Sequence, residues 1–420
     1  MENYHTNNEC RICKSKDLEL ILDLGIQPPA NAFIKEQDLE KNEDKFPLRL
    51  FFCKNCYLAQ LLDIVDKEFL FKNYLYLTGS SKPIVSHFRN YAKDIFSNFL
   101  QNSKDSFVIE IGSNDGSLLK EFKKLGTSVL GIEPAQNIAK IANDNGIQTV
   151  NNFLNVEIAE KISSEKKASV IVANNVLGHV EDLKEFVKCV KILLNNEGIF
   201  VFEVPYLIDL IQNLEFDTIY HEHLSYFSLK PLIRLMNEFE LEIFDVKKQN
   251  VHGGTIRVFV GKKNYVEKST ELNKFVILEE KVGIDKIETF REFSQKVEML
   301  KNSLLNTLNE IKLEGKEIFG YGAPAKGNVL LNFCKIGTNF LDYIIDTTPI
   351  KQGLFTPGMH IPVKTDNIIT EIRSDSVALL LAWNYASDII NKEKRFIENG
   401  GTFLIPVPEP KLIYNNSEKV

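Results

Sequence analysis

The sequence predicts an α/β protein built from an N-terminal metal-binding module followed by two Rossmann-like domains. The chain has 420 residues, more than a single hydrophobic core usually supports. Two closely spaced pairs of cysteines occur near its start, and the order apolar strand, glycine turn, helix occurs twice further along. We therefore expect three domains, at residues 1–70, 71–264 and 265–420.

The composition is that of an ordinary globular protein and disfavours some partners. A net charge of −7 and a pI near 5.7 provide no general field that would attract nucleic acid or anionic lipid. The longest apolar run, at 377–383, is far too short to cross a bilayer. The first residues, MENYHTNNEC, lack the basic and apolar regions of a secretory signal. We expect a cytoplasmic protein without nucleic-acid or membrane partners; the oligomeric state, monomer included, stays open.

Four of the six cysteines form two C-x2-C pairs, CRIC and CKNC. Each short turn points two sulfurs at one place, so two such knuckles present four thiolates tetrahedrally, as a structural zinc site requires. The 39 residues between the pairs exceed the usual spacing and predict an elaborated loop between them. The alternative is four ordinary buried thiols. The predicted zinc ligands are Cys10, Cys13, Cys53 and Cys56.

Strand and helix patterns alternate through the middle of the chain. An apolar strand at 107–111 leads into the turn EIGSNDG and then into a helix with apolar residues three and four apart. The stretches SVLGIEPA, IQTVNNF, ASVIVANNV, DLKEFVKCVKILL and GIFVFEVPY continue the alternation. This βαβ order implies a parallel, doubly wound sheet with its ligand at the carboxyl ends of the strands.

The first glycine turn has the features of a nucleoside-binding site. Gly112 and Gly116 let a ligand approach the backbone, and Glu133 ends the next strand at the spacing suited to two ribose hydroxyls. The turn departs from G-x-G-x-x-G and so lacks the loop that binds a pyrophosphate. S-adenosylmethionine, which has no pyrophosphate, fits better, and Asn114 and Asp115 would contact its amino acid end. The alternative is a purely structural turn. Further cofactor-binding candidates are Pro134, Asn152, Phe153 and Asn174.

The last part of the chain contains a second glycine turn. Residues 265–313 have the charged, helical pattern of a connector between domains, and KEIFGYGAPAKGNVLLNFC then repeats strand, turn and helix. This turn could bind NAD, but no acidic residue is clearly placed for a ribose. We expect its backbone NH groups, the helix N-terminus and Lys326 to face a phosphorylated group, with Tyr321 and His252 as further substrate-binding candidates. A scaffold without a ligand is the alternative.

One more cluster, YHEHLSYFS at 220–228, places two histidines around a glutamate. Such a cluster is either a metal site or an acid–base apparatus. Because the four cysteines already fill a tetrahedral zinc site, the metal interpretation is weakened.

These motifs occur in one order: the cysteine pairs with LGIQPPANAF between them, EIGSNDGSLL, NVLGHV, YHEHLSYFS, VHGGTIRVFV and GYGAPAKGN. Over essentially its whole length the chain resembles the zinc-containing, S-adenosylmethionine-dependent sugar C-methyltransferases, which methylate C-3 of nucleotide-linked 4-keto deoxysugars. The resemblance implies a class I methyltransferase Rossmann-like middle domain, a structural zinc, and a nucleotide sugar framed by the N- and C-terminal domains. The residues at the family's active-site positions are Tyr76, His179, Tyr220, Glu222 and His223.

Methylating a sugar carbon requires a carbon nucleophile, which forms beside a ketone once a base removes the α-proton. We expect His223 to be that base and Glu222 to fix orientation or charge nearby. Tyr220, Tyr76 and His179 would hold the enolate or protonate around C-4.

Two points stay open at this level. If the histidine segment is extended, His221 and His223 share one face and Glu222 lies on the other; a structural role is favoured for His221. The rival functions are an O- or N-methyltransferase on the same scaffold and, from another class, a non-catalytic zinc-ribbon scaffold.

Overall fold

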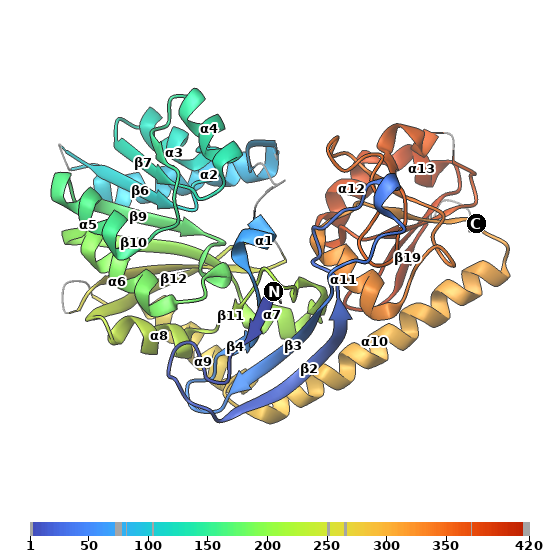
Figure 1. Ribbon diagram of the computed structural model, residues 1–420, viewed down its shortest axis with the longest axis horizontal. Helices are drawn as coiled ribbons and strands as arrows, with labels where there is room; N and C mark the ends of the chain where they lie inside the picture. The colour runs from blue at the N-terminus through green and yellow to red at the C-terminus, as the bar shows by residue number, and fades with distance from the viewer. Residues whose placement is uncertain are drawn as a thin grey trace.

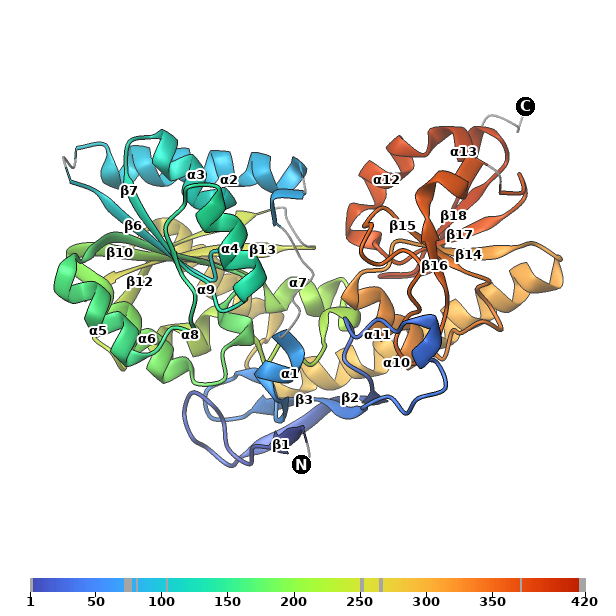
Figure 2. The ribbon, with the colours of Figure 1, turned by 45° about the horizontal axis from the view of Figure 1, so that its top comes forward.

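The computed structural model describes residues 3–71, 78–80, 82–102, 105–249, 253–263, 267–370 and 372–414. Two α/β lobes, the middle and C-terminal domains, stand side by side, and N-terminal strands and one long helix run beneath them (Figure 1, Figure 2). The predicted fold class is confirmed. Two predicted site residues, Tyr76 and His252, lie outside the described residues.

The N-terminal module consists of two small antiparallel sheets. Four strands pair in the order β11-β4-β3-β2, and two more pair as β1-β5. Buried and partly exposed residues alternate along most of β3, as expected for a strand with one covered face. Strand β11 belongs to the histidine-containing segment, so this sheet joins that segment to the N-terminal module. The bounds are β1 (Tyr4–Thr6), β2 (Leu18–Gln27), η1 (Glu36–Asp38), β3 (Phe46–Cys53), β4 (Ala59–Leu61), β5 (Asp63–Val65), α1 (Lys67–Phe71) and β11 (Ser225–Tyr226).

A seven-stranded sheet forms the centre of the middle domain, in the order β12-β13-β10-β9-β6-β7-β8. The strands from β10 to β8 are parallel, whereas β13 runs antiparallel to both of its neighbours. Both faces are buried, which explains the continuous apolar runs in these strands. The bounds are β6 (Phe107–Ile111), β7 (Ser128–Ile132), β8 (Thr149–Val150), β9 (Ala168–Asn174), β10 (Leu194–Pro205), β12 (Leu241–Gln249) and β13 (Thr255–Lys262).

Helices cover each face of this sheet. On β9, Val170 and Val172 pack in the cluster with α2, α3 and α4, while Ile171 and Ala173 pack in the cluster with α5, α6 and α8. The bounds are η2 (Thr78–Ser80), α2 (Lys82–Ile95), η3 (Phe96–Leu100), α3 (Ser117–Lys124), α4 (Gln136–Asp144), α5 (Val156–Glu165), η4 (Leu177–His179), α6 (Leu183–Leu193), α7 (Leu207–Gln212), η5 (Phe216–Thr218) and α8 (Leu229–Asn237).

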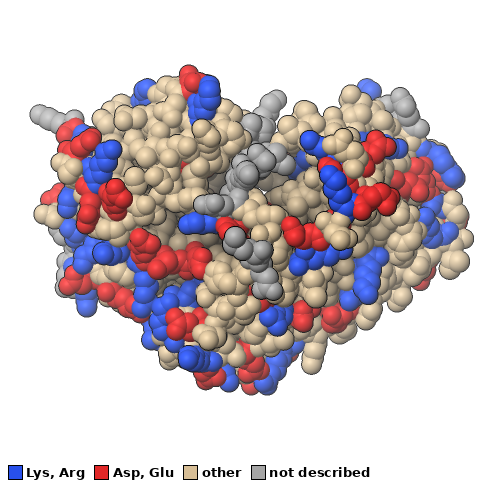
Figure 3. All heavy atoms as spheres, in the orientation of Figure 1, with Lys and Arg blue, Asp and Glu red and all other residues tan. Residues whose placement is uncertain are grey.

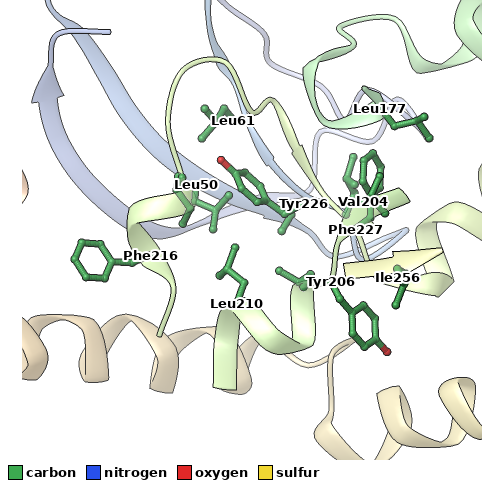
Figure 4. Close-up of a cluster of buried hydrophobic side chains, with 14 of the residues drawn as sticks. Leu50, Leu61, Leu177, Val204, Tyr206, Leu210, Phe216, Tyr226, Phe227 and Ile256 are labelled. Atoms are coloured by element: carbon green, nitrogen blue, oxygen red, sulfur yellow. The ribbon is translucent and has the colours of Figure 1, made fainter. Parts of the chain in front are cut away.

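The N-terminal module shares a hydrophobic core with the middle domain. Leu50 and Leu61 of the module lie beside Tyr226, and Val204 and Phe227 of the middle domain belong to the same group of buried side chains (Figure 4). Burying apolar surface in common fixes the two parts against each other. The histidine-containing segment runs through this shared core.

Two helices, α9 (Thr270–Val282) and α10 (Ile287–Leu313), lead to the C-terminal domain. The 27 residues of α10 span about 40 Å at 1.5 Å per residue. Its buried side chains recur every three or four residues, and the helix contacts β2 and α7 along its length. It therefore lies beneath both lobes, as Figure 1 shows.

The C-terminal domain has a six-stranded sheet in the order β16-β15-β14-β17-β18-β19, parallel except for β19. The strand order reverses between β14 and β17, which is where ligands bind in open α/β sheets. The bounds are β14 (Ile318–Tyr321), α11 (Ala325–Cys334), β15 (Ile344–Asp346), β16 (Val363–Thr365), η6 (Asp366–Thr370), β17 (Val377–Leu380), η7 (Trp383–Tyr385), α12 (Ala386–Lys392), α13 (Lys394–Glu398), β18 (Thr402–Ile405) and β19 (Lys411–Ile413).

Among the described residues, no helix is long and apolar enough to cross a membrane. On the face drawn in Figure 3, acidic and basic side chains are interspersed.

Candidate active site

The four cysteines converge on one point. Their sulfurs all lie within 4.8 Å of one another, with 3.4 Å between the Sγ atoms of Cys10 and Cys56 and 3.5 Å between those of Cys13 and Cys53. The two knuckles are alike: in each, the residue following the second cysteine adopts a positive φ and donates its NH to the carbonyl of the first. Four thiolates so placed fit a tetrahedral zinc with no open position, which is a structural site.

Arg11 connects the first knuckle to the histidine-containing segment. Its buried guanidinium donates to the carbonyl oxygens of Leu224 at 2.5 Å and Leu61 at 3.0 Å, and its backbone NH donates to Gln60 Oε1 at 3.1 Å. A cation buried this deeply is stable only with its hydrogen bonds made, so the knuckle and the segment hold each other in register. Its function as a link could not be recognised from sequence, because its partners, two backbone carbonyls and the Gln60 side chain, lie far along the chain.

The first glycine turn requires its glycines. Gly112 has φ +67° and a Cβ there would come within 2.5 Å of a methyl of Val176, while Gly116 has φ +75° and would contact Ile147. Glu133 closes the turn: its carboxylate accepts the NH of Asn114 and the NH of Ala135, each at 2.9 Å. Burial raises its pKa.

The two predicted residues of the turn, Asn114 and Asp115, contact the segment before α2. Asn114 Oδ1 accepts the NH of Thr78 at 3.0 Å, and Asp115 Oδ2 accepts the NH of Gly79 at 2.8 Å. Asp115 Oδ1 also accepts the hydroxyl of Ser117 at 2.6 Å. These side chains thus hold the 78–79 segment over the turn.

The buried acceptors beside this turn suit a cationic ligand. Glu110 Oε2, Asn174 Oδ1 and Asn175 Oδ1 are buried without a hydrogen-bond partner among the described residues, at the carboxyl ends of β6 and β9. Buried polar atoms are normally paired, so the N–H groups of a ligand ammonium would complete these three acceptors. The residues present therefore fit S-adenosylmethionine, which carries an ammonium and a sulfonium.

The loop after β8 lies at the same edge of the sheet. Asn151 Nδ2 donates to the carbonyls of Glu133 and Pro134, each at 2.9 Å, which joins this loop to the end of β7. The predicted Asn152 and Phe153 follow it, and the Phe153 ring is 37% exposed with the Lys67 ammonium 4.5 Å from its centre. Of these residues, Asn151 was absent from the prediction.

Three predicted catalytic rings meet beside η4. The rings of Tyr220 and His223 are 4.0 Å apart between centres, and those of His179 and His223 are 4.8 Å apart. The NH of Leu224 donates to the carbonyl of Gly178 at 2.6 Å, which fixes the segment against η4. The structure therefore groups residues that the sequence separates by more than forty positions.

The histidine segment is a turn and not extended, which corrects the geometry considered for an extended chain. The NH of His223 donates to the carbonyl of Tyr220 at 2.8 Å, and residues 221–222 form the bend. As a result His221 and His223 do not share a face. His221 Nε2 lies 3.3 Å from the carbonyl of Phe46, while His223 Nδ1 lies 2.9 Å from the carbonyl of Thr218.

The contact with Thr218 sets the tautomer of His223. A carbonyl only accepts hydrogen bonds, so Nδ1 must carry the proton, and in the neutral ring Nε2 carries the lone pair. Nε2 is therefore the atom of His223 that can take a proton.

Glu222 is buried and contacts the N-terminal module, not His223. Its carboxylate accepts the Nδ2–H of Asn31 at 2.7 Å. Burial raises the pKa of Glu222 to about 7, and the hydrogen bond from Asn31 acts against this shift. Asn31 lies on the predicted elaborated loop, within the motif LGIQPPANAF, but it was not among the predicted site residues.

His179 stays neutral. Its ring keeps part of its surface exposed, but it is surrounded closely enough that desolvation lowers its pKa to about 4, with a backbone hydrogen bond at Glu222 acting in the other direction. Burial likewise lowers the pKa of His221 to about 4. Near neutral pH, both are uncharged imidazoles.

The C-terminal domain contacts this site through η7 and α11. Trp383 Nε1–H donates to Asp217 Oδ2 at 2.6 Å, and the Lys326 ammonium lies 4.4 Å from the centre of the Trp383 ring. Desolvation lowers the pKa of Lys326, while the nearby carboxylates of Asp217 and Glu215 act to raise it. Burial raises the pKa of Asp217 to about 6 and that of Glu215 to about 7.

An acidic residue does stand at the second glycine turn, contrary to the sequence interpretation. Asp346 ends β15, and its carboxylate accepts the NH of Ala323 in the turn at 2.6 Å and the NH of Thr348 at 2.7 Å. Lys351, also not predicted, donates to the carbonyl of Ala323 at 2.8 Å, with its ammonium 5.3 Å from the ring centre of Phe33. The reason for the miss is that β15 has only three residues, which leaves its end undefined in sequence.

Tyr321 is placed differently from Lys326. Its hydroxyl donates to Glu393 at 2.7 Å and its ring packs against Phe403, within the core between the sheet and the helices α12 and α13. This placement gives no support to a substrate contact by Tyr321.

Models of three protein families match successive parts of the chain. They describe a zinc-binding domain, a methyltransferase domain and a C-methyltransferase C-terminal domain, at residues 10–71, 85–246 and 250–408. The C-methyltransferase NovU of Streptomyces niveus is 35% identical over 408 residues, covering 97% of both chains.

Solved structures match the chain over less than half of its length. A S-adenosylmethionine-dependent methyltransferase from Clostridium acetobutylicum covers 42% of this chain and 92% of its own at 14% identity, with a TM-score of 0.34. A protein of Pyrococcus horikoshii covers 47% and 99% at 13% identity, with a TM-score of 0.37.

Proposed function

The chain belongs to the zinc-containing, S-adenosylmethionine-dependent C-methyltransferases, and from that premise we propose that it methylates C-3 of a nucleotide-linked 4-keto-6-deoxysugar through an enolate, with His223 as the base. The observation that carries the proposal is the grouping of His223, Tyr220 and His179, with Nε2 of His223 as the atom that can accept a proton. The active enzyme is expected in the cytoplasm; its oligomeric state is left open.

The first step is removal of the C-3 proton. His223 Nε2 takes the proton, and the electron pair of the C–H bond moves towards the C-4 ketone, whose oxygen becomes the enolate oxygen. The hydrogen bond from Nδ1–H to the Thr218 carbonyl stabilises the imidazolium that results. Bound S-adenosylmethionine supplies an electrophilic methyl group to the carbon so activated.

The enolate oxygen requires hydrogen-bond donors. Tyr220 and His179 lie on either side of His223, and we assign the Tyr220 hydroxyl as the donor to the enolate oxygen. Desolvation keeps His179 neutral, and its single N–H would turn from the backbone of Glu222 to the enolate oxygen when the substrate binds. We assign Tyr76 to the same role. Glu222, bound to Asn31, then contributes by fixing the turn between Tyr220 and His223.

The nucleotide end of the substrate belongs at the second glycine turn. Two ammonium groups, of Lys326 and Lys351, stand near this turn and suit a diphosphate. The turn lies where the strand order of the sheet reverses, between β14 and β17. The loop that carries Asn31 and Phe33 extends from the catalytic turn to this sheet, so one substrate would contact both.

Isotope exchange tests the role of His223. With S-adenosylhomocysteine and a 4-keto sugar nucleotide in D2O, the wild-type enzyme should incorporate deuterium at C-3 although no methyl group can be transferred. His223→Asn should slow exchange and methylation together, by roughly 10²–10⁴-fold. His221→Asn, which alters the buried histidine that contacts Phe46, should have a milder effect.

Substrate affinity should change far less than the rate in His223→Asn, because the lost interaction belongs to the transition state. Exchange by this variant at a near wild-type rate would assign the base to another residue, with Tyr220 and His179 as the next candidates.

A further inference from the structure

The short helix η5, Phe216–Thr218, makes two kinds of contact. At its end, the Thr218 carbonyl accepts the Nδ1–H of His223 at 2.9 Å. One residue earlier, Asp217 Oδ2 accepts the indole NH of Trp383 at 2.6 Å, and Trp383 belongs to the C-terminal domain. The group that orients His223 is therefore one peptide away from a contact between domains.

The carboxylate of Asp217 is held at this contact. The side chain is 0% exposed, and its other oxygen, Oδ1, is buried without a hydrogen-bond partner among the described residues. Lys326 is the cation that acts on it, and Lys326 stacks on the same Trp383 ring. Burying a carboxylate costs free energy unless it is paired, so the position of Asp217 depends on the C-terminal domain supplying the indole NH.

The neighbouring residue strengthens this dependence. The ring of Phe216 lies 5.3 Å from that of Phe333 in α11, between ring centres, and η5 packs against α11 along its length. Phe216 and Asp217 are thus held by the C-terminal domain, while Thr218 contacts His223 and donates its NH and its hydroxyl to the Glu215 carbonyl. The contact between domains and the carbonyl that orients His223 belong to adjacent residues of one three-residue helix.

We propose that Asp217 is a positioning residue for His223, and that the C-terminal domain holds the catalytic imidazole in its productive orientation through the Trp383–Asp217 hydrogen bond. This inference rests on the proposed role of His223 as base. It assigns the C-terminal domain a part in proton transfer, separate from binding the nucleotide.

Trp383→Phe tests the proposal with little risk to folding, because the side chain is only half-buried. The change removes the NH donor and keeps an aromatic ring beside Lys326. With saturating sugar nucleotide and S-adenosylhomocysteine in D2O, the kcat for exchange at C-3 should fall by up to about 10²-fold, the scale of a displacement near 1 Å, with KM little changed. Tyr385→Phe, a change in the same short helix η7, is the matched control and should exchange as the wild type does.

Asp217→Asn is the second variant. Its amide oxygen can still accept the indole NH, so exchange should be largely retained, and the double variant with Trp383→Phe should be no slower than Trp383→Phe alone. Wild-type exchange in Trp383→Phe, or a higher KM with unchanged kcat, would overturn the proposal. So would a loss in Asp217→Asn as large as that in Trp383→Phe.

A spectroscopic readout keeps this inference separate from the proposed function. In protein labelled with 15N-histidine, the signal of His223, assigned by its loss in His223→Asn, reports which ring nitrogen carries the proton. The neutral ring should be protonated at Nδ1 in the wild type and should lose this preference in Trp383→Phe. The same tautomer in the wild type and in Trp383→Phe would overturn the inference even if His223 is the base. A different tautomer in Trp383→Phe, together with a wild-type enzyme that never exchanges the C-3 proton, would contradict only the proposed function.

Discussion

The two glycine turns of this protein are built alike and differ in charge. In each, the carboxylate at the end of the second strand accepts two backbone NH groups, one from the turn and one from the residue two places after the acid. Glu133 accepts the NH groups of Asn114 and Ala135. Asp346 accepts those of Ala323 and Thr348. The same backbone device therefore shapes both sites.

The surroundings of the turns differ in their cations. Beside the first lie the oxygen acceptors of Glu110, Asp115 and Asn174. Beside the second, the ammonium groups of Lys326 and Lys351 accompany the carboxylates of Asp346, Asp217 and Glu215. At short range inside a protein such charges act strongly. The first glycine turn thus suits a cationic cofactor, and the second suits an anionic nucleotide. The two turns share their backbone structure, so the side chains around them set which ligand each accepts.

Removal of zinc should separate the two sites most clearly. The loop between the knuckles contacts the C-terminal domain through paired backbone hydrogen bonds between Ile34 and Phe355, and through Glu43 and the NH of Gly358. Cys53→Ser leaves three zinc ligands, so this module should lose stability. Calorimetry should then show a larger loss of nucleotide affinity than of S-adenosylhomocysteine affinity, because the loop contacts the C-terminal domain directly whereas the module supports the middle domain through their shared core. Normal nucleotide affinity in a zinc-free but folded chain would contradict this view of the loop.

Glu133→Ala should affect the first turn alone. Its carboxylate would accept two ribose hydroxyls, and each hydrogen bond to a charged group contributes roughly 1.5–3 kcal/mol. The affinity for S-adenosylhomocysteine should fall at least about ten-fold, with the nucleotide bound as before. If calorimetry finds the cofactor affinity unchanged, the carboxylate neither binds the ribose nor is needed to shape the turn.

Asp346→Ala is the reciprocal variant. Loss of the carboxylate frees the NH groups of Ala323 and Thr348, so the second turn should lose its shape and nucleotide affinity should drop, by less than in the zinc-free chain. Cofactor affinity should stay at the wild-type value. A variant that weakens both ligands equally would show that the two turns are not independent.

Salt should distinguish the turns by a smaller margin. Ionic strength screens charges over about 10 Å at 0.1 M and about 3 Å at 1 M. Binding of a nucleoside diphosphate near Lys326 and Lys351 should therefore weaken more with added salt than binding of S-adenosylhomocysteine does. The Lys351→Met variant should reduce this salt dependence, and an unaltered slope would argue against a contact between Lys351 and phosphate.

Local patterns in the sequence predicted the parts of the site that depend on spacing. The cysteine pairs, the turn at Gly112 and the acid at Glu133 are each specified within a few residues or by one βαβ unit, and the structure groups them as expected. The cluster of His179, Tyr220 and His223 came from family resemblance, because its members belong to different elements.

Contacts between domains were not predictable. Asn31 contacts Glu222 across 191 positions, and Trp383 contacts Asp217 across 166. Asn31 and Glu222 lie in the motifs LGIQPPANAF and YHEHLSYFS, but neither motif shows that the two side chains meet. Glu222 illustrates the consequence: its neighbour in sequence is His223, but a turn directs the carboxylate towards the N-terminal module. Which side chains complete a site between domains is decided by how the domains dock.

The central claim, methylation of a sugar carbon, is tested most directly by locating the new methyl group. The purified enzyme would be given S-adenosylmethionine carrying a 13C-methyl group and a panel of nucleotide 4-keto-6-deoxysugars, and the product would be examined by NMR. We predict a methyl carbon coupled directly to C-3 of the sugar. A methyl group on oxygen or nitrogen, from any substrate of the panel, would contradict the enolate mechanism and the role proposed for His223.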